Sequence, residues 1–108
     1  MPKYLVQASY TSEGTKGLLR DGGSKRRAVV EKGLQALGGK LESFYFCFGS
    51  SDVVIIAELP DAVSAAAVSL NTGSTGAVKL TTTQLLSVED VDAACKKTSA
   101  FTYTPPGA

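Results

Sequence analysis

The chain has 108 residues, of which 44% are hydrophobic and 19% charged, and its formal net charge is +1. This length fits one globular domain, and this charge offers no broad field for nucleic acid or anionic lipid. The chain has no histidine, which excludes histidine-based catalytic triads and zinc sites, and we predict neither a metal nor a cofactor. No apolar run is long enough to span a membrane, so we expect a cytoplasmic protein with no membrane and no nucleic-acid partner.

The first part of the chain predicts a strand and a helix joined by a glycine-rich connection. Residues 3–10 alternate between apolar and polar side chains as a strand does. Residues 15–23, TKGLLRDGG, predict only a short helical turn that stops at two glycines. Residues 24–39 predict a helix with Ser24 as its N-cap. The apolar face of this helix consists of Val30, Leu34 and Leu37.

Three basic residues stand in the first turn of this helix. Lys25, Arg26 and Arg27 oppose the helix dipole, which is unfavourable by up to about 1 kcal/mol. Two interpretations stay open at this point. Either the turn marks an anion-binding position, or it is a solvated basic turn that Glu31 partly offsets.

A hairpin follows, and its second strand is apolar on both faces. Residues 40–48 and 53–59 form the strands around a turn at residues 49–52. The run VVIIA in the second strand has no polar interruption, so both of its faces need cover. After this strand, Asp61 is the expected N-cap of a second long helix. The apolar stripe expected on that helix consists of Val63, Ala66, Ala67 and Leu70.

The last third of the chain predicts a strand, a third helix and a tail. Residues 77–86, AVKLTTTQLL, are rich in β-branched side chains and predict a fourth strand. Ser87 and Asp90 fit a capping box at the start of the third helix. We therefore expect one domain over residues 1–97, followed by a polar tail of residues 98–108.

Two cysteines are present, Cys47 in the hairpin and Cys95 in the third helix. One disulfide between them is possible in principle, but a cytosolic chain with an ordinary core rarely needs one. We expect both thiols to be reduced and buried, with Cys47 as a small core residue.

The order of elements predicts an α+β fold of the ferredoxin-like type, β-α-β-β-α-β, with an antiparallel sheet, helices on one face and an added C-terminal helix. The other face of the sheet would expose an apolar patch. We expect a second copy of the sheet to cover it, which gives a dimeric α/β barrel, either a homodimer or a larger even-numbered oligomer. The expected interface residues are Phe46, Val54 and Ile56, although a one-residue shift of the strand would exchange Phe46 for Cys47.

Four blocks of the chain carry a family resemblance: PKYLVQASYTSEGTKGLL, GGSKRRAVVEKGLQALGGKLESFYFCFG, SSDVVIIAELPD and GAVKLTTTQLLS. Across them the chain resembles the GYD domain proteins, a bacterial group in the dimeric α/β barrel superfamily. The motif that names the family falls at the hairpin turn, where Gly49 and Asp52 are in place and Ser51 stands where a tyrosine is usual. The resemblance implies the fold and the assembly, while any role of that tyrosine hydroxyl does not carry over.

Two functions from different classes stay open, and the sequence leaves open whether the protein is an enzyme. The first is a homo-oligomeric small-molecule-binding or assembly module, whose apolar inter-sheet space admits a small apolar or aromatic ligand. The second, suggested by the superfamily, is a cofactor-independent monooxygenase or isomerase acting on a small aromatic or a lactone. An enzyme requires two or more polar candidates around one cavity. The candidate ligand-binding residues are Tyr10, Tyr45, Asp52 and Glu58.

Each candidate also has a structural interpretation. Asp52 fits a hairpin turn in which it accepts backbone N–H groups. Glu58 lies near a strand end, where it is either solvated or paired with Lys3. Tyr10 and Tyr45 combine an apolar ring with a polar tip, which suits an interface as well as a cavity mouth.

Overall fold

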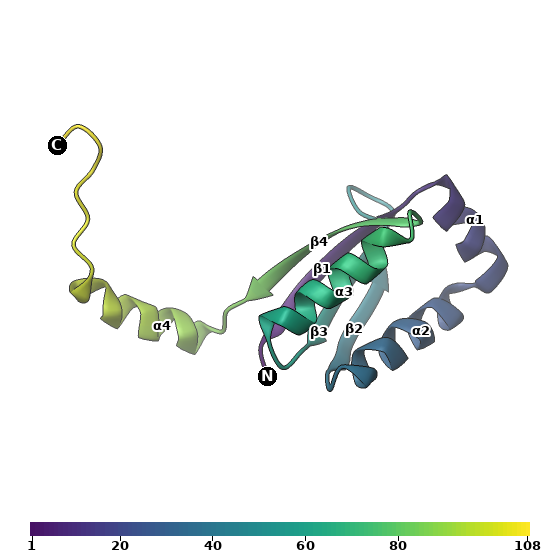
Figure 1. The fold of residues 1–108 in the computed structure, drawn as a ribbon, viewed down its shortest axis with the longest axis horizontal. Coiled ribbons are helices and arrows are strands. Elements are labelled where there is room, and N and C mark those ends of the chain that lie inside the picture. The colour runs from purple at the N-terminus through teal and green to yellow at the C-terminus, as the bar shows by residue number, and fades with distance from the viewer.

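The computed structural model describes all 108 residues, and its four strands form one antiparallel sheet in the order β2-β3-β1-β4 (Figure 1). In chain order the elements are β1 (Lys3–Tyr10), α1 (Ser12–Asp21), α2 (Gly23–Ala36), β2 (Lys40–Phe46), β3 (Val53–Glu58), α3 (Ala62–Ser74), β4 (Val78–Leu85), α4 (Val88–Lys97) and a short 3-10 helix (Thr98–Ala100). This strand order confirms the predicted α+β, ferredoxin-like class.

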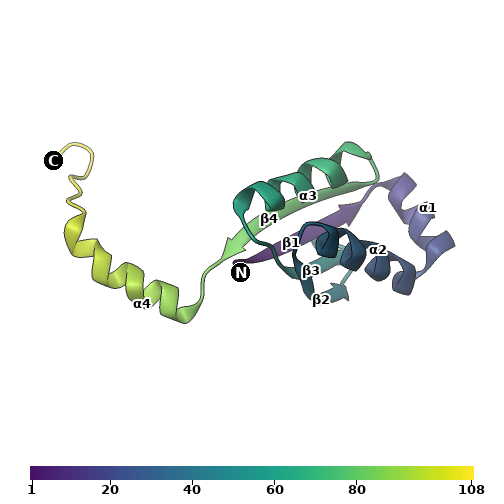
Figure 2. The ribbon, with the colours of Figure 1, turned by 60° about the horizontal axis from the view of Figure 1, so that its bottom comes forward.

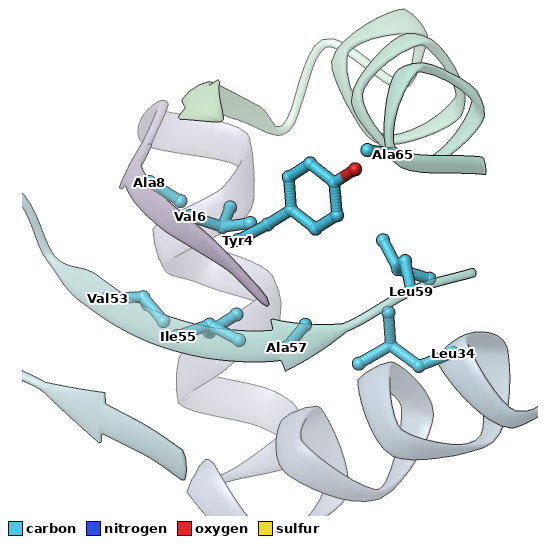
Figure 3. Close-up of a cluster of buried hydrophobic side chains, with 9 residues drawn as sticks. All are labelled: Tyr4, Val6, Ala8, Leu34, Val53, Ile55, Ala57, Leu59 and Ala65. Atoms are coloured by element: carbon cyan, nitrogen blue, oxygen red, sulfur yellow. The ribbon is translucent and has the colours of Figure 1, made fainter. Parts of the chain in front are cut away.

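Both long helices, α2 and α3, cover the same face of the sheet (Figure 2). Alternate residues of β1 and β3 point to this face, and α2 adds Leu34 while α3 adds Ala65 (Figure 3). In Figure 3 the Tyr4 hydroxyl lies toward Ala65. The buried core consists of Tyr4, Val6, Ala8, Leu34, Val53, Ile55, Ala57, Leu59 and Ala65.

The opposite face of the sheet carries no long helix, and its centre is apolar. The strand register places Ile56 beside Leu5 and Val54 beside Tyr45. Leu5, Val54 and Ile56 are half-buried, and the ring of Tyr45 is exposed. Since Gln7 lies beside Val54 on β1, the face is mixed, with an apolar patch rather than an unbroken apolar layer. We call Leu5, Tyr45, Val54 and Ile56 the open-face patch.

Phe46 lies on the helix-covered face. It pairs with the buried Val53 and packs against the core, and its ring lies 3.0 Å from the position that a Cβ on Gly23 would take. Because neighbouring strand residues point to opposite faces, Phe46 is on the other side of the sheet from Val54 and Ile56. The three residues expected to form the interface do not share a face, and Tyr45 takes the place of Phe46 beside Val54.

The first crossover contains a complete helix where the sequence predicted only a short turn. The side chain of Thr11 caps α1 by accepting a hydrogen bond from the backbone nitrogen of Gly14 at 3.3 Å. Gly22 then separates α1 from α2 with a φ of 77°, a left-handed value that favours glycine. Gly22, and not the expected Ser24, stands at the N-cap of α2. This cap stabilises the start of α1, a helix whose glycines led the sequence to predict only a turn.

Helix α3 turns a different face to the sheet from the one predicted. Val63 is 78% exposed and Leu70 is 74% exposed, while Ala65 is buried. The side of the helix that carries Ser69 faces β4, where its hydroxyl lies 2.7 Å from the hydroxyl of Thr82. Because α3 is rich in alanine, its apolar pattern does not distinguish one face from another. That pattern also cannot predict that the Ser69 hydroxyl faces the sheet.

Both cysteines are free, as predicted, but both are exposed, which corrects the expectation that they are buried. Strand β2 ends at Phe46, so Cys47 lies in the hairpin loop instead of in the sheet. Its thiol donates to the carbonyl oxygen of Ser51 at 3.0 Å. Cys95 lies on α4, which has no buried residue.

Helix α4 projects away from the rest of the chain (Figures 1 and 2). The predicted capping box is confirmed, since Ser87 and Asp90 exchange two hydrogen bonds of 3.0 Å. The radius of gyration is 17.3 Å, against about 13 Å for a compact domain of this length. None of the helices combines the length and the apolar character that a membrane crossing requires.

The predicted N-cap of α3 is confirmed and makes stability depend on pH. The backbone nitrogen of Ser64 donates to Oδ1 of Asp61 at 2.8 Å, and this bond lowers the pKa of the carboxyl below its ordinary value. A lowered pKa adds stability above the unfolded-state value and loses it as the pH falls through the folded-state value.

We therefore expect the stability advantage of wild type over Asp61→Asn to shrink between about pH 6 and about pH 2.5, because asparagine caps without a charge. Urea denaturation at both pH values measures this difference. An advantage that is the same at both would contradict the assignment.

Candidate functional site

A small apolar cavity lies between the helix-covered face of the sheet and helices α2 and α3. Its volume is about 90 Å³, and 14 of its 17 lining residues are hydrophobic. Strand residues such as Ala8 and Ile55 form its floor, while Val30 of α2 and Val68 of α3 form its walls. Apolar enclosure of this kind favours the hydrocarbon part of a small molecule.

An open groove of about 600 Å³ between α2 and α3 continues this cavity. Cavities near 150 Å³ admit a benzene ring, so the 90 Å³ cavity alone is tight for one. A ligand of ordinary size must therefore extend from the cavity into the groove. Six residues line both spaces: Arg26, Val30, Leu34, Val68, Thr72 and Val78.

Arg26 and Tyr10 give this space one polar end. Arg26 is the only charged residue in the lining of the cavity or of the groove. Burial raises the pKa of the Tyr10 hydroxyl, while the adjacent Arg26 guanidinium acts in the opposite direction. Because that pKa stays above its ordinary value, the phenol is protonated at neutral pH and available as a hydrogen-bond donor.

The topology explains why these two side chains meet. Tyr10 is the last residue of β1 and pairs with Val78 at the start of β4. Arg26 is in the first turn of α2, and Thr72 is near the end of α3. All four elements therefore reach the same end of the sheet, where the cavity opens into the groove.

The structure brings two of the four predicted site residues together. The backbone nitrogen of Tyr10 donates to Oδ2 of Asp52 at 2.8 Å, and the backbone nitrogen of Asp52 donates to the carbonyl oxygen of Ala8 at 2.8 Å. Asp52 thus joins the hairpin turn to the end of β1, and it is absent from the cavity lining. Of the two, only Tyr10 faces the cavity.

The other two predicted residues lie on the open face of the sheet. Tyr45 is 68% exposed beside Val54. The Glu58 carboxylate lies 3.7 Å from the ammonium of Lys40, whereas Lys3, its expected partner, pairs with Glu42. Tyr45 and Glu58 are therefore separated from Tyr10 by the sheet itself. Nowhere do three cysteine, aspartate or glutamate side chains gather as a metal site would require.

Sequence reasoning missed the main polar residue of this site. Arg26 was visible only as one of three bases that oppose the dipole of their helix. That signal was pertinent, but it does not distinguish Arg26 from Lys25 and Arg27. Val68 and Thr72 were missed for another reason, because the face of α3 was assigned incorrectly.

Comparison with known proteins gives one result that bears on this fold. Residues 4–95 match the family model described as GYD domain. No curated protein and no solved structure gives a significant match. The matched segment begins in β1 and ends within α4, so it contains the cavity, the groove and the open-face patch. Since this segment is most of the 108 residues, the chain belongs to the GYD domain family.

Proposed function

We propose that the protein is a homo-oligomeric module that binds a small apolar or aromatic molecule between its sheet and its two long helices. The observation that carries this proposal is the continuity of the apolar cavity with the groove, which together offer a ligand both cover and an entrance. The sequence alone suggested a ligand space between two sheets, whereas the proposed space lies between one sheet and its helices.

The open-face patch supports the homo-oligomeric part of the proposal. Leu5, Val54 and Ile56 form an apolar centre that neither α2 nor α3 covers. A second copy of the same face, related by a two-fold axis, would match this patch in size and in strand spacing. We propose a homodimer or a larger even-numbered oligomer on this basis, and the cytoplasmic location stays a prediction.

Binding fits the arrangement of polar groups better than catalysis does. Acid–base chemistry without a cofactor needs at least two side chains within reach of one ligand that can exchange a proton. Of the four candidates, only Tyr10 lines the cavity, and its neighbour Arg26 stays protonated and cannot serve as a general acid or base. Monooxygenase or isomerase chemistry therefore has no observation in its favour beyond the superfamily resemblance.

Filling the cavity wall should abolish ligand binding. Val68 lines both the cavity and the groove, so Val68→Phe is expected to occupy the space that the ligand would take. The matched control is Val63→Phe, on the same helix but 78% exposed. Isothermal titration calorimetry with indole should detect binding to wild type and Val63→Phe, and none to Val68→Phe. Equal binding by all three proteins would place the ligand elsewhere.

A further inference from the structure

We infer that the ligand is an apolar or aromatic carboxylate, whose hydrocarbon part enters the cavity and whose carboxylate meets Arg26 and Tyr10. This inference rests on the proposed function, since it names the chemical class of ligand for the same cavity and groove. It is drawn from the charge, the hydrogen-bonding capacity and the shape of that space.

The charge at the polar end is positive. Arg26 is the single charged side chain that lines either space, and a guanidinium matches the planar geometry of a carboxylate. Its partner Asp21 is 3.8 Å away and also lies 3.6 Å from the ammonium of Lys25. Two cations thus share one carboxylate, and the other acidic group near this end, Asp52, does not line either space.

The hydrogen-bonding groups at this end can serve an anion. The protonated Tyr10 hydroxyl is a donor, and it stands beside the Arg26 guanidinium, which has only donors. Asp52 is the acidic group next to Tyr10, but its Oδ2 already accepts the backbone nitrogen of Tyr10 and it does not line the cavity. Tyr10 and Arg26 therefore both offer donors to the space, and Asp21, which Arg26 shares with Lys25, does not line it.

The shape calls for a molecule with two unlike ends. An inorganic anion would leave the apolar cavity empty, and a plain hydrocarbon would offer no acceptor to the Arg26 and Tyr10 donors. Asn71, Thr72 and Thr75 also line the groove, so its lining is more polar than that of the cavity. An aromatic ring or short alkyl chain inside, with a carboxylate at the mouth, satisfies both regions.

The experiment compares a carboxylate with its neutral amide. We would titrate 3-phenylpropionate and 3-phenylpropanamide into wild type, Arg26→Gln and Arg27→Gln by calorimetry at neutral pH. Arg27 is the matched control, because it follows Arg26 in the same helix turn but lines a different hollow, over β2. Wild type and Arg27→Gln should bind the acid at least about tenfold more tightly than the amide, and Arg26→Gln should lose that preference.

The possible outcomes separate the two proposals. Equal binding of acid and amide to wild type would overturn the carboxylate assignment and leave the binding function standing. If Arg27→Gln also lost the preference for the acid, the preference would come from the overall positive charge of this helix turn. That result would overturn the specific role of Arg26. Failure of wild type to bind either compound, together with indole, would overturn the binding function itself. If Arg26→Gln does not fold, Tyr10→Phe should still reduce the preference severalfold, and an unchanged preference would contradict the inference.

Discussion

Replacing Ile56 by aspartate is expected to dissociate the proposed homo-oligomer while each subunit stays folded. Ile56 lies in the open-face patch, so a two-fold interface would bring two new carboxylates into apolar surroundings. Burying one unpaired charge costs about 3–5 kcal/mol, which corresponds to at least about 100-fold weaker association. In the separated subunit the same carboxylate is hydrated, so the fold is retained. Sedimentation velocity at micromolar concentration measures the association, and circular dichroism measures the fold.

Two further variants make this result specific. Val63→Asp places the same charge on an exposed position of α3 and should leave the oligomer intact. Phe46→Asp should unfold the subunit, because Phe46 packs under the helices against the core. A wild-type protein that is monomeric at micromolar concentration would refute the assembly, and dissociation by Phe46→Asp without unfolding would refute the assigned strand faces.

The parts of the fold that follow from local chemistry could be predicted from the sequence. The order of the four strands, the two long helices and the last helix is confirmed, as are the Asp61 cap and the Ser87–Asp90 capping box, which depend on a few neighbouring residues. The antiparallel class follows as well, because the hairpin and the alternation of the strands leave few other topologies.

The features that depend on which face a residue takes could not be predicted in the same way. A strand shifted by one residue exchanges its faces, so the sequence alone left Phe46 and Cys47 interchangeable in the interface. The structure resolves this through the register, which pairs Phe46 with Val53. It also ends β2 one residue before Cys47, which exposes a thiol that the apolar neighbours suggested was buried.

The candidate site could not be predicted either, because its residues are distant from one another in the sequence. Tyr10 lines the cavity, but the charged residue beside it in that lining is Arg26 and not one of the other candidate residues. The two lie 16 positions apart, and the whole of α1 lies between the end of β1 and the start of α2. Because the sequence predicted only a turn there, it gave no reason to place Arg26 beside Tyr10.

The stability of the fold should depend strongly on the absence of a side chain at Gly14, in the helix α1 that connects β1 to α2. A Cβ added to Gly14 would lie 2.1 Å from the carbonyl oxygen of Ala77 and 3.0 Å from Cδ1 of Tyr10. That carbonyl already accepts the backbone nitrogen of Thr11 at 3.0 Å, so relief of the clash would break this bond. We expect Gly14→Ala to lower the free energy of unfolding by about 2–3 kcal/mol, even though alanine favours a helix.

The matched control is Gly33→Ala, at a helical glycine whose added Cβ would have no atom within 4 Å. This change should raise the free energy of unfolding by about 0.5–1 kcal/mol, the usual gain of alanine over glycine in a helix. Urea denaturation measures the free energy of unfolding of both variants. If both substitutions changed it in the same direction, the close approach of α1 to the start of β4 would be contradicted. Because Tyr10 lies next to Gly14, folded Gly14→Ala protein should also bind 3-phenylpropionate more weakly than wild type.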